Sequence, residues 1–181
     1  NYSAFTARII NNGEIIFDED EIELFAESNE SKIFKYCVNE MKLNVAAACA
    51  VLANIKAESG FKPTSYGDNN TSYGICQWHA SRFTDLKKYC KNHNLNWKTL
   101  ESQLKFLKYE LTTKKGSKYE DTWDKLKKTK NNANGAREAA EFWCKIFEVP
   151  KDAEKEAKKR SELAVNTYWK KYKSYAVKIK T

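Results

Sequence analysis

The segment 45–59 constrains the fold more than any other part of this sequence. Its residues are apolar on nearly every side of a helix, which is the pattern of a central buried helix. Asn44 stands where a helix N-cap belongs, and Gly60 with Pro63 marks the end of the helix. The unbroken apolar run Val45–Ala53 is less than half of the ~20 residues that span a bilayer. The sequence therefore predicts a helical globule built around this helix.

The flanking segments indicate a mainly α fold of the α+β type. Residues 7–17, around Asn12-Gly13, predict a β-hairpin, and an acidic stretch follows to residue 30. Helical periodicity begins at about Ser31, which we interpret as a cap. Residues 60–74 carry turn-forming residues throughout and predict a long irregular loop. We expect an N-terminal hairpin and acidic linker over 1–30, one domain over 31–181, and later helices near 80–93, 97–114, 117–129, 133–148 and 151–173.

The charge is divided unevenly along the chain. Residues 1–60 hold five Lys/Arg and ten Asp/Glu, a net −5, whereas residues 61–181 hold 27 and 14, a net +13. A cationic body attracts polyanions such as nucleic acid, anionic membranes and anionic cell-wall polymers. Only four of the 32 basic residues are Arg, the residue preferred for bidentate base readout, which argues against sequence-specific nucleic-acid binding. A solvated lysine-rich surface without a partner is the alternative.

The cysteines and histidines do not form a metal-binding pattern. Five cysteines are an odd number, and none lies in a C-x-x-C pair. His79 and His93 are fourteen residues apart, which is not the spacing of a zinc finger. We expect neither a disulfide scaffold nor a metal or organic cofactor. The sequence has no initiator Met and no signal peptide, and we interpret it as a segment of a larger protein that is monomeric as an isolated domain.

Glu58 is the first candidate catalytic residue. It falls in the last turn of the apolar helix, where the helix dipole disfavours a negative charge and burial disfavours ionisation. Both effects favour a carboxyl group that keeps its proton near neutral pH, as a general acid requires. The alternative is a structural Glu that accepts hydrogen bonds from loop amides.

Asp68 is the second candidate. It follows Gly67 in a polar turn ten residues after Glu58, where we expect it to stay ionised. Glycosidases use two carboxyl groups in contrasting environments, one protonated and one charged. The alternative for Asp68 is an Asx-turn residue. Downstream, Tyr73 and Trp78 offer aromatic faces for sugar rings and Gln77 offers an amide, although both aromatic residues are also compatible with a place in the core.

The order of these motifs resembles the lysozyme superfamily. The matching segments are Ala57–Pro63, Gly67-Asp68 and Ser72–Trp78. The sequence is most similar to phage-tail lysozyme domains, and more distantly to goose-type lysozymes and soluble lytic transglycosylases. In those families a catalytic Glu ends a central helix, and a loop or small hairpin leads to a Gly-x-x-Gln turn. The later Phe147–Pro150 segment is similar to the phage-tail family as well. His79 stands where the goose-type pattern has a second Asp.

The resemblance implies a lysozyme-like catalytic domain over 31–181 with Glu58 as general acid. It implies Tyr73 and Gln77 as cleft residues, and Asp68 would activate water or stabilise the positive sugar ring. From their own chemistry we expect Trp78 and His79 to bind substrate as well, with help in positioning water as the alternative role of His79. The implied reaction is cleavage of the MurNAc–GlcNAc β-1,4 bond of peptidoglycan, outside the cell or on a virion. A lytic transglycosylase that forms 1,6-anhydro-MurNAc with Glu58 alone is one alternative. A cell-wall-binding module without catalysis, or a domain that has lost its activity, is another.

Overall fold

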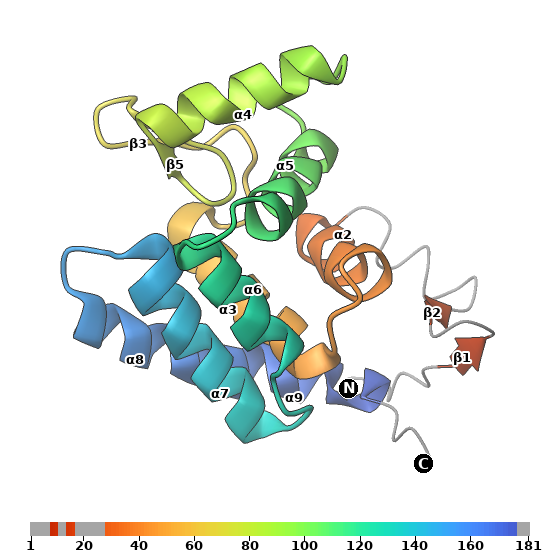
Figure 1. Ribbon diagram of the computed structural model, residues 1–181. Helices are drawn as coiled ribbons and strands as arrows, with labels where there is room; N and C mark the ends of the chain where they lie inside the picture. The colour runs from red at the N-terminus through yellow and green to blue at the C-terminus, as the bar shows by residue number, and fades with distance from the viewer. Residues whose placement is uncertain (1–7, 11–13, 17–27, 177–181) are drawn as a thin grey trace.

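The computed structural model describes residues 8–10, 14–16 and 28–176, and these residues are mainly helical (Figure 1). The centre of the fold is helix α3 (Val45–Ser59), in which every residue from Val45 to Ile55 is buried. The Asn44 side chain caps it by accepting a hydrogen bond from the Ala47 amide. Gly60 ends it in the left-handed conformation (φ 61°), where the missing Cβ removes the steric penalty. The predicted central helix is confirmed at both ends.

The other helices pack around α3. Helices α7 (Ala133–Phe142) and α8 (Ala153–Leu163) and the segment η3 (Ala164–Trp169) contact it from one side, and α2 (Asn29–Lys35) contacts it from another (Figure 1). The segments η1 (Tyr36–Glu40), η2 (Trp143–Glu148) and η3 are π-helical, and the helices expected near 133–148 and 151–173 are present, each passing without a break from α-helix into a π-helical segment. The elements are α2 (Asn29–Lys35), η1 (Tyr36–Glu40), α4 (Ser81–Asn92), α5 (Leu100–Thr113), α6 (Lys118–Lys127), α7 (Ala133–Phe142), η2 (Trp143–Glu148), α8 (Ala153–Leu163), η3 (Ala164–Trp169), α9 (Lys170–Tyr172) and the 3₁₀-helix η4 (Lys173–Tyr175).

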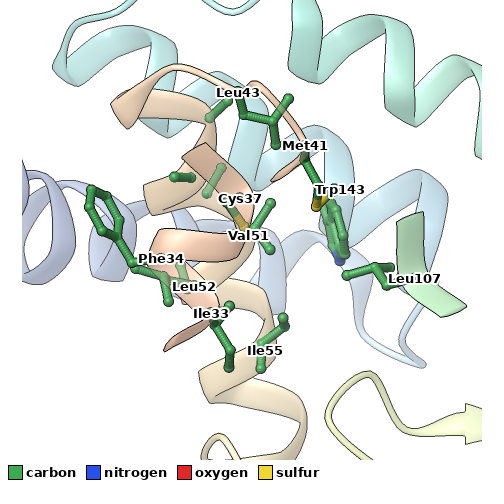
Figure 2. Packing of buried hydrophobic residues seen from close by; sticks show 14 of the residues in the cluster. Ile33, Phe34, Cys37, Met41, Leu43, Val51, Leu52, Ile55, Leu107 and Trp143 are labelled. Atoms are coloured by element: carbon green, nitrogen blue, oxygen red, sulfur yellow. The ribbon is translucent and has the colours of Figure 1, made fainter. Parts of the chain in front are cut away.

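The core lies between α3 and the helices that cover it. Figure 2 shows Ile33 and Phe34 of α2 beside Leu52 and Ile55 of α3, with Trp143 of η2 on another side of the cluster. All these side chains are almost fully buried. A helix that is apolar all round is stable in this fold because neighbours cover it on several sides.

Helix α2 begins earlier than the sequence analysis expected. Ser28, not Ser31, is the N-cap, and its hydroxyl accepts a hydrogen bond from the Ser31 amide at 3.4 Å. Ser31 is buried within the first turn and donates its own hydroxyl to the Ser28 carbonyl oxygen at 2.9 Å. The assignment of Ser31 as the cap is therefore wrong, because two serines three residues apart offer the same capping chemistry and only the first precedes the helix.

Two short strands are described at the N-terminus. Strands β1 (Arg8–Ile10) and β2 (Glu14–Ile16) pair antiparallel, with Arg8 opposite Ile16. This pairing agrees with the predicted hairpin. The predicted turn at Asn12-Gly13 and most of the acidic stretch lie outside the described residues.

All five cysteines are buried with free thiols. They lie on separate elements: η1, α3, the loop before β5, α4 and η2. Within the described ranges, no helix is long and apolar enough to cross a bilayer.

Candidate active site

The C-terminal end of α3 is fixed to the loop that follows it. Ser59, next to Glu58, donates its hydroxyl to the carbonyl oxygens of Ile55 at 3.2 Å and Ile75 at 2.9 Å. Ile75 lies in the Gly74–Gln77 turn, and its amide donates to the buried side chain of Gln103 at 3.0 Å. Glu58 therefore lies on a helix end whose position is set by side-chain hydrogen bonds to the loop.

The loop contains a three-stranded antiparallel sheet, which Figure 1 shows below α4. Its strands are β3 (Tyr66–Gly67), β4 (Ser72–Tyr73) and β5 (Trp78–His79), with β4 in the middle. Residues 68–70, between β3 and β4, are all left-handed, with Asp68 at φ 48°. Asp and Asn tolerate this conformation better than most residues, which explains the Asp-Asn-Asn sequence.

Asp68 is held by hydrogen bonds within this sheet. The Ser72 hydroxyl donates to Asp68 Oδ2 at 2.6 Å and lies 3.0 Å from His79 Nδ1. Because the hydroxyl hydrogen is directed to Asp68, the Ser72 oxygen can accept a hydrogen bond from His79 Nδ1–H. His79 Nδ1 is itself 3.7 Å from Asp68 Oδ2. Asp68 is 70% exposed and His79 61% exposed, so both side chains are accessible to a ligand.

Glu58 is ion-paired rather than bonded to loop amides. Its Oε1 lies 2.7 Å from Arg160 Nη2 on α8, and the two side chains are 18% and 5% exposed. Arg160 also donates from Nη1 to Asn54 at 3.2 Å and approaches Glu156 with Nε at 3.5 Å. In the described part of the chain, no loop amide donates to Glu58. No local motif in the sequence marks Arg160 as the partner of Glu58, although Arg is scarce in this lysine-rich chain and is the usual partner of a buried carboxylate.

A third carboxyl group, Glu148, lies near this ion pair. Its Oε1 accepts a hydrogen bond from the Trp143 indole at 2.9 Å. Burial raises the pKa of Glu148 to about 8, and the negative charge of Glu58 adds to the rise. Arg82, Trp143 and Arg160 act in the opposite direction. In the sequence Glu148 stands out only as part of the Phe147–Pro150 segment, because its approach to Glu58 depends on the tertiary fold.

The three other candidate residues near the turn help to build the loop. Gln77 donates its side-chain amide to the Ser65 and Gly74 carbonyl oxygens at 3.0 and 2.9 Å, and it is partly exposed. Tyr73 is buried against Phe83, with ring centroids 5.0 Å apart and nearly parallel planes. Trp78 is also buried. Of these three, Gln77 alone has a partly exposed side chain.

A fully buried carboxylate lies under the sheet. Glu110 on α5 is 0% exposed and accepts two hydrogen bonds from Arg82, at 3.0 and 2.7 Å. The Trp78 indole donates to the same carboxylate at 3.1 Å. This network joins α4, α5 and β5, and it supports the sheet that carries Asp68.

The site thus has two groups of side chains. Glu58 lies with Arg160 and Glu148 at the end of α3, whereas Asp68 lies with Ser72 and His79 on the sheet. No hydrogen bond or ion pair among the described side chains joins the two groups. Nor does a cluster of three or more metal-ligating His, Cys, Asp or Glu side chains occur within 28–176.

A partly buried Glu at the end of a central helix, followed by a small antiparallel sheet in a helical domain, defines a lysozyme-like protein. The family model described as phage tail lysozyme matches residues 28–172, and the chain belongs to that family. Family membership supports a general role in cell-wall lysis, on a virion or at the wall. A search of curated proteins found no match.

Proposed function

We propose that this chain is a peptidoglycan hydrolase that cleaves the MurNAc–GlcNAc β-1,4 bond, an N-acetylmuramidase. The observation that carries the proposal is the position of Glu58, a partly buried carboxyl group on a fixed helix end, which is followed in the chain by a sheet with an accessible second carboxylate, Asp68. The family match supports the wall as the target. The net +13 of residues 61–181 suits a wall that carries teichoic acids and peptide carboxylates.

In the proposed reaction Glu58 donates a proton to the glycosidic oxygen as the bond to the MurNAc anomeric carbon breaks. A water molecule adds to that carbon, and its released proton passes to a carboxylate. We assign Asp68 to orient this water or to stabilise the positive ring, with Ser72 and His79 holding its side chain in place. Gln77 and His79 are the proposed polar contacts to the glycan. Tyr73 and Trp78 are buried, and we assign them to support of the loop that carries these contacts.

A lytic transglycosylase is the second candidate. That reaction needs only Glu58, as acid and then as base, with a substrate hydroxyl closing the 1,6-anhydro ring. The observation in its favour is that Asp68 accepts a hydrogen bond from Ser72 within the sheet. Among the described residues it makes no ion pair or hydrogen bond with Glu58 or Arg160.

Mass spectrometry of wall digests separates the candidates. The muramidase is expected to release fragments with reducing MurNAc ends. Anhydro-MurNAc ends would establish the transglycosylase, and reducing GlcNAc ends would show that the other glycosidic bond is cut. Binding to walls without any release of fragments would indicate a non-catalytic binding module.

For Asp68→Asn we expect turnover to fall about 10²- to 10⁴-fold, with wall binding nearly unchanged. The substitution removes one charge but keeps a side-chain oxygen that accepts the Ser72 hydroxyl hydrogen. Turnover and wall binding are measured on the same preparation. Asp85→Asn on α4 is the matched control, since it removes one exposed carboxylate that pairs with Lys114. Near-normal turnover of Asp68→Asn would reassign Asp68 to the turn alone.

A further inference from the structure

Two hydroxyl groups beside Asp68 have their hydrogens committed. The Thr71 hydroxyl lies 2.7 Å from the Asp68 carbonyl oxygen, which can only accept, so the hydroxyl hydrogen is directed to it. The Ser72 hydroxyl lies 2.6 Å from Asp68 Oδ2, and a carboxylate oxygen likewise accepts. Each hydroxyl oxygen is therefore left with lone pairs alone for any further partner.

Both of these oxygens lie close to one nitrogen of His79. The ring nitrogen Nδ1 is 3.0 Å from Ser72 Oγ and 3.3 Å from Thr71 Oγ1, and Asp68 Oδ2 is 3.7 Å away. Because all three oxygens are acceptors in this arrangement, a lone pair on Nδ1 would meet only other lone pairs. In the neutral imidazole the hydrogen therefore belongs on Nδ1, which leaves Nε2 as an acceptor.

The backbone holds His79 beside the two hydroxyl groups. Ser72 and His79 are opposite each other in the pairing of β4 with β5, and the Ala80 amide donates to the Thr71 carbonyl oxygen at 3.0 Å. Gln77 and Ala80, on either side of Trp78-His79, both have φ 48°, which is strained for residues with a Cβ. Such strain is commonly kept at functional positions. The sheet thus fixes Nδ1 while the His79 side chain stays 61% exposed.

We propose that His79 binds the glycan as a hydrogen-bond acceptor through Nε2, with Thr71 and Ser72 as positioning residues that hold its ring in the Nδ1–H tautomer. The matching ligand groups are those that donate a hydrogen, a sugar hydroxyl or the N–H of an acetamido group. The inference rests on the proposed function and names the part of that substrate which His79 contacts.

Asp68 strengthens this preference for neutral donors. Its carboxylate is 70% exposed next to His79, and it offers further acceptor atoms to the same ligand. A carboxylate of a wall peptide has no hydrogen to donate, and the charge of Asp68 repels it. Although residues 61–181 are cationic as a whole, this exposed part of the sheet is suited to the uncharged groups of the sugars.

Nitrogen-15 NMR of the histidine rings tests the tautomer without any measurement of activity. The chain has two histidines, and His93 is an internal reference, because its Nδ1 lies 2.8 Å from the Tyr89 carbonyl oxygen and must donate to it. At mildly alkaline pH we expect both rings to carry the hydrogen on Nδ1. In Thr71→Val/Ser72→Ala only His79 should lose this preference, whereas Thr71→Ser keeps both oxygens and should match the wild-type protein. A wild-type His79 with its hydrogen on Nε2, or an unchanged tautomer in the double variant, overturns the proposal.

Titration with a GlcNAc tetrasaccharide tests the contact itself. We expect the His79 Nε2 resonance to shift on binding, and Kd to rise about 3- to 10-fold in His79→Ala and in the double variant, as for the loss of one neutral hydrogen bond. His93→Ala is the matched control and should leave Kd unchanged. An Nε2 resonance that does not move, whether or not the sugar binds elsewhere, overturns the proposal. Wall digests without glycosidic cleavage would instead contradict the proposed function, and the tautomer and the Nε2 shift would still decide this inference.

Discussion

Replacing Glu58 with glutamine is expected to lower the release of glycan fragments from walls by about 10²- to 10⁴-fold, the usual contribution of a general acid. Glutamine has nearly the same shape and keeps an oxygen for the Arg160 hydrogen bond, but it has no acidic proton to give to the glycosidic oxygen. The helix end should stay in place, because Ser59 and Gly60 fix it independently of the carboxylate. Fragment release, wall binding and the thermal unfolding midpoint are measured on the same preparation.

Glu156→Gln is the matched control for this experiment. Glu156 also contacts Arg160, at 3.5 Å, but it lies on α8 rather than at the end of α3. We expect its activity to stay close to that of the wild-type protein. Full activity of Glu58→Gln would show that another group supplies the proton, and a loss in both variants would point to Arg160 rather than to Glu58.

Replacing Arg82 with alanine is expected to lower the free energy of unfolding by about 3–5 kcal/mol, because it leaves a buried carboxylate without its main partner. Glu110 is fully buried and receives two hydrogen bonds from Arg82. The Trp78 indole and a more distant Lys114, 3.8 Å away, cannot replace a bidentate guanidinium. Urea or thermal unfolding gives the measurement.

Two further variants test the cause of that loss. Arg137→Ala on α7 removes an exposed arginine and should change the stability by less than about 0.5 kcal/mol. In Arg82→Ala/Glu110→Gln the buried negative charge is absent, so the double variant should be more stable than Arg82→Ala alone. Equal stability of the single and double variants would mean that the unpaired charge on Glu110 is not the source of the destabilisation.

Local sequence signals were sufficient to predict the central helix α3 and both of its ends. Asn44 and Gly60 bound α3 at the predicted residues, because a side-chain cap and a left-handed glycine act within one turn of the helix. The π-helical segments were not predictable in the same way. An extra residue in a helical turn has no compositional signature. In η2 it is accompanied by the local Trp143–Glu148 hydrogen bond and by packing of the segment against α3 and α8.

The candidate site was predictable only where its residues are close in sequence. Glu58 and the loop to His79 form one continuous stretch, so their order and spacing could be read directly. Arg160 and Glu148 come from the last third of the chain, and only the packing of η2 and α8 brings them to Glu58. The sequence signal for these tertiary partners was composition, since Arg82 and Arg160 are two of only four arginines. Arg160 pairs with Glu58 of the candidate site, and Arg82 pairs with Glu110, which supports the sheet.

Because all five cysteines are buried, alkylation of their thiols can be used to measure local unfolding of the protein. Burial raises the pKa of each thiol, to about 12 for Cys37 and about 11 for Cys144, and a thiol must become a thiolate before an alkylating reagent can attack it. Labelling therefore requires that the element carrying the cysteine first separates from the core. Cys37, Cys49, Cys76, Cys90 and Cys144 lie on five different elements, so site-resolved alkylation rates would rank the order in which these parts open. No disulfide links these thiols, so a reducing buffer leaves the covalent structure of the domain intact.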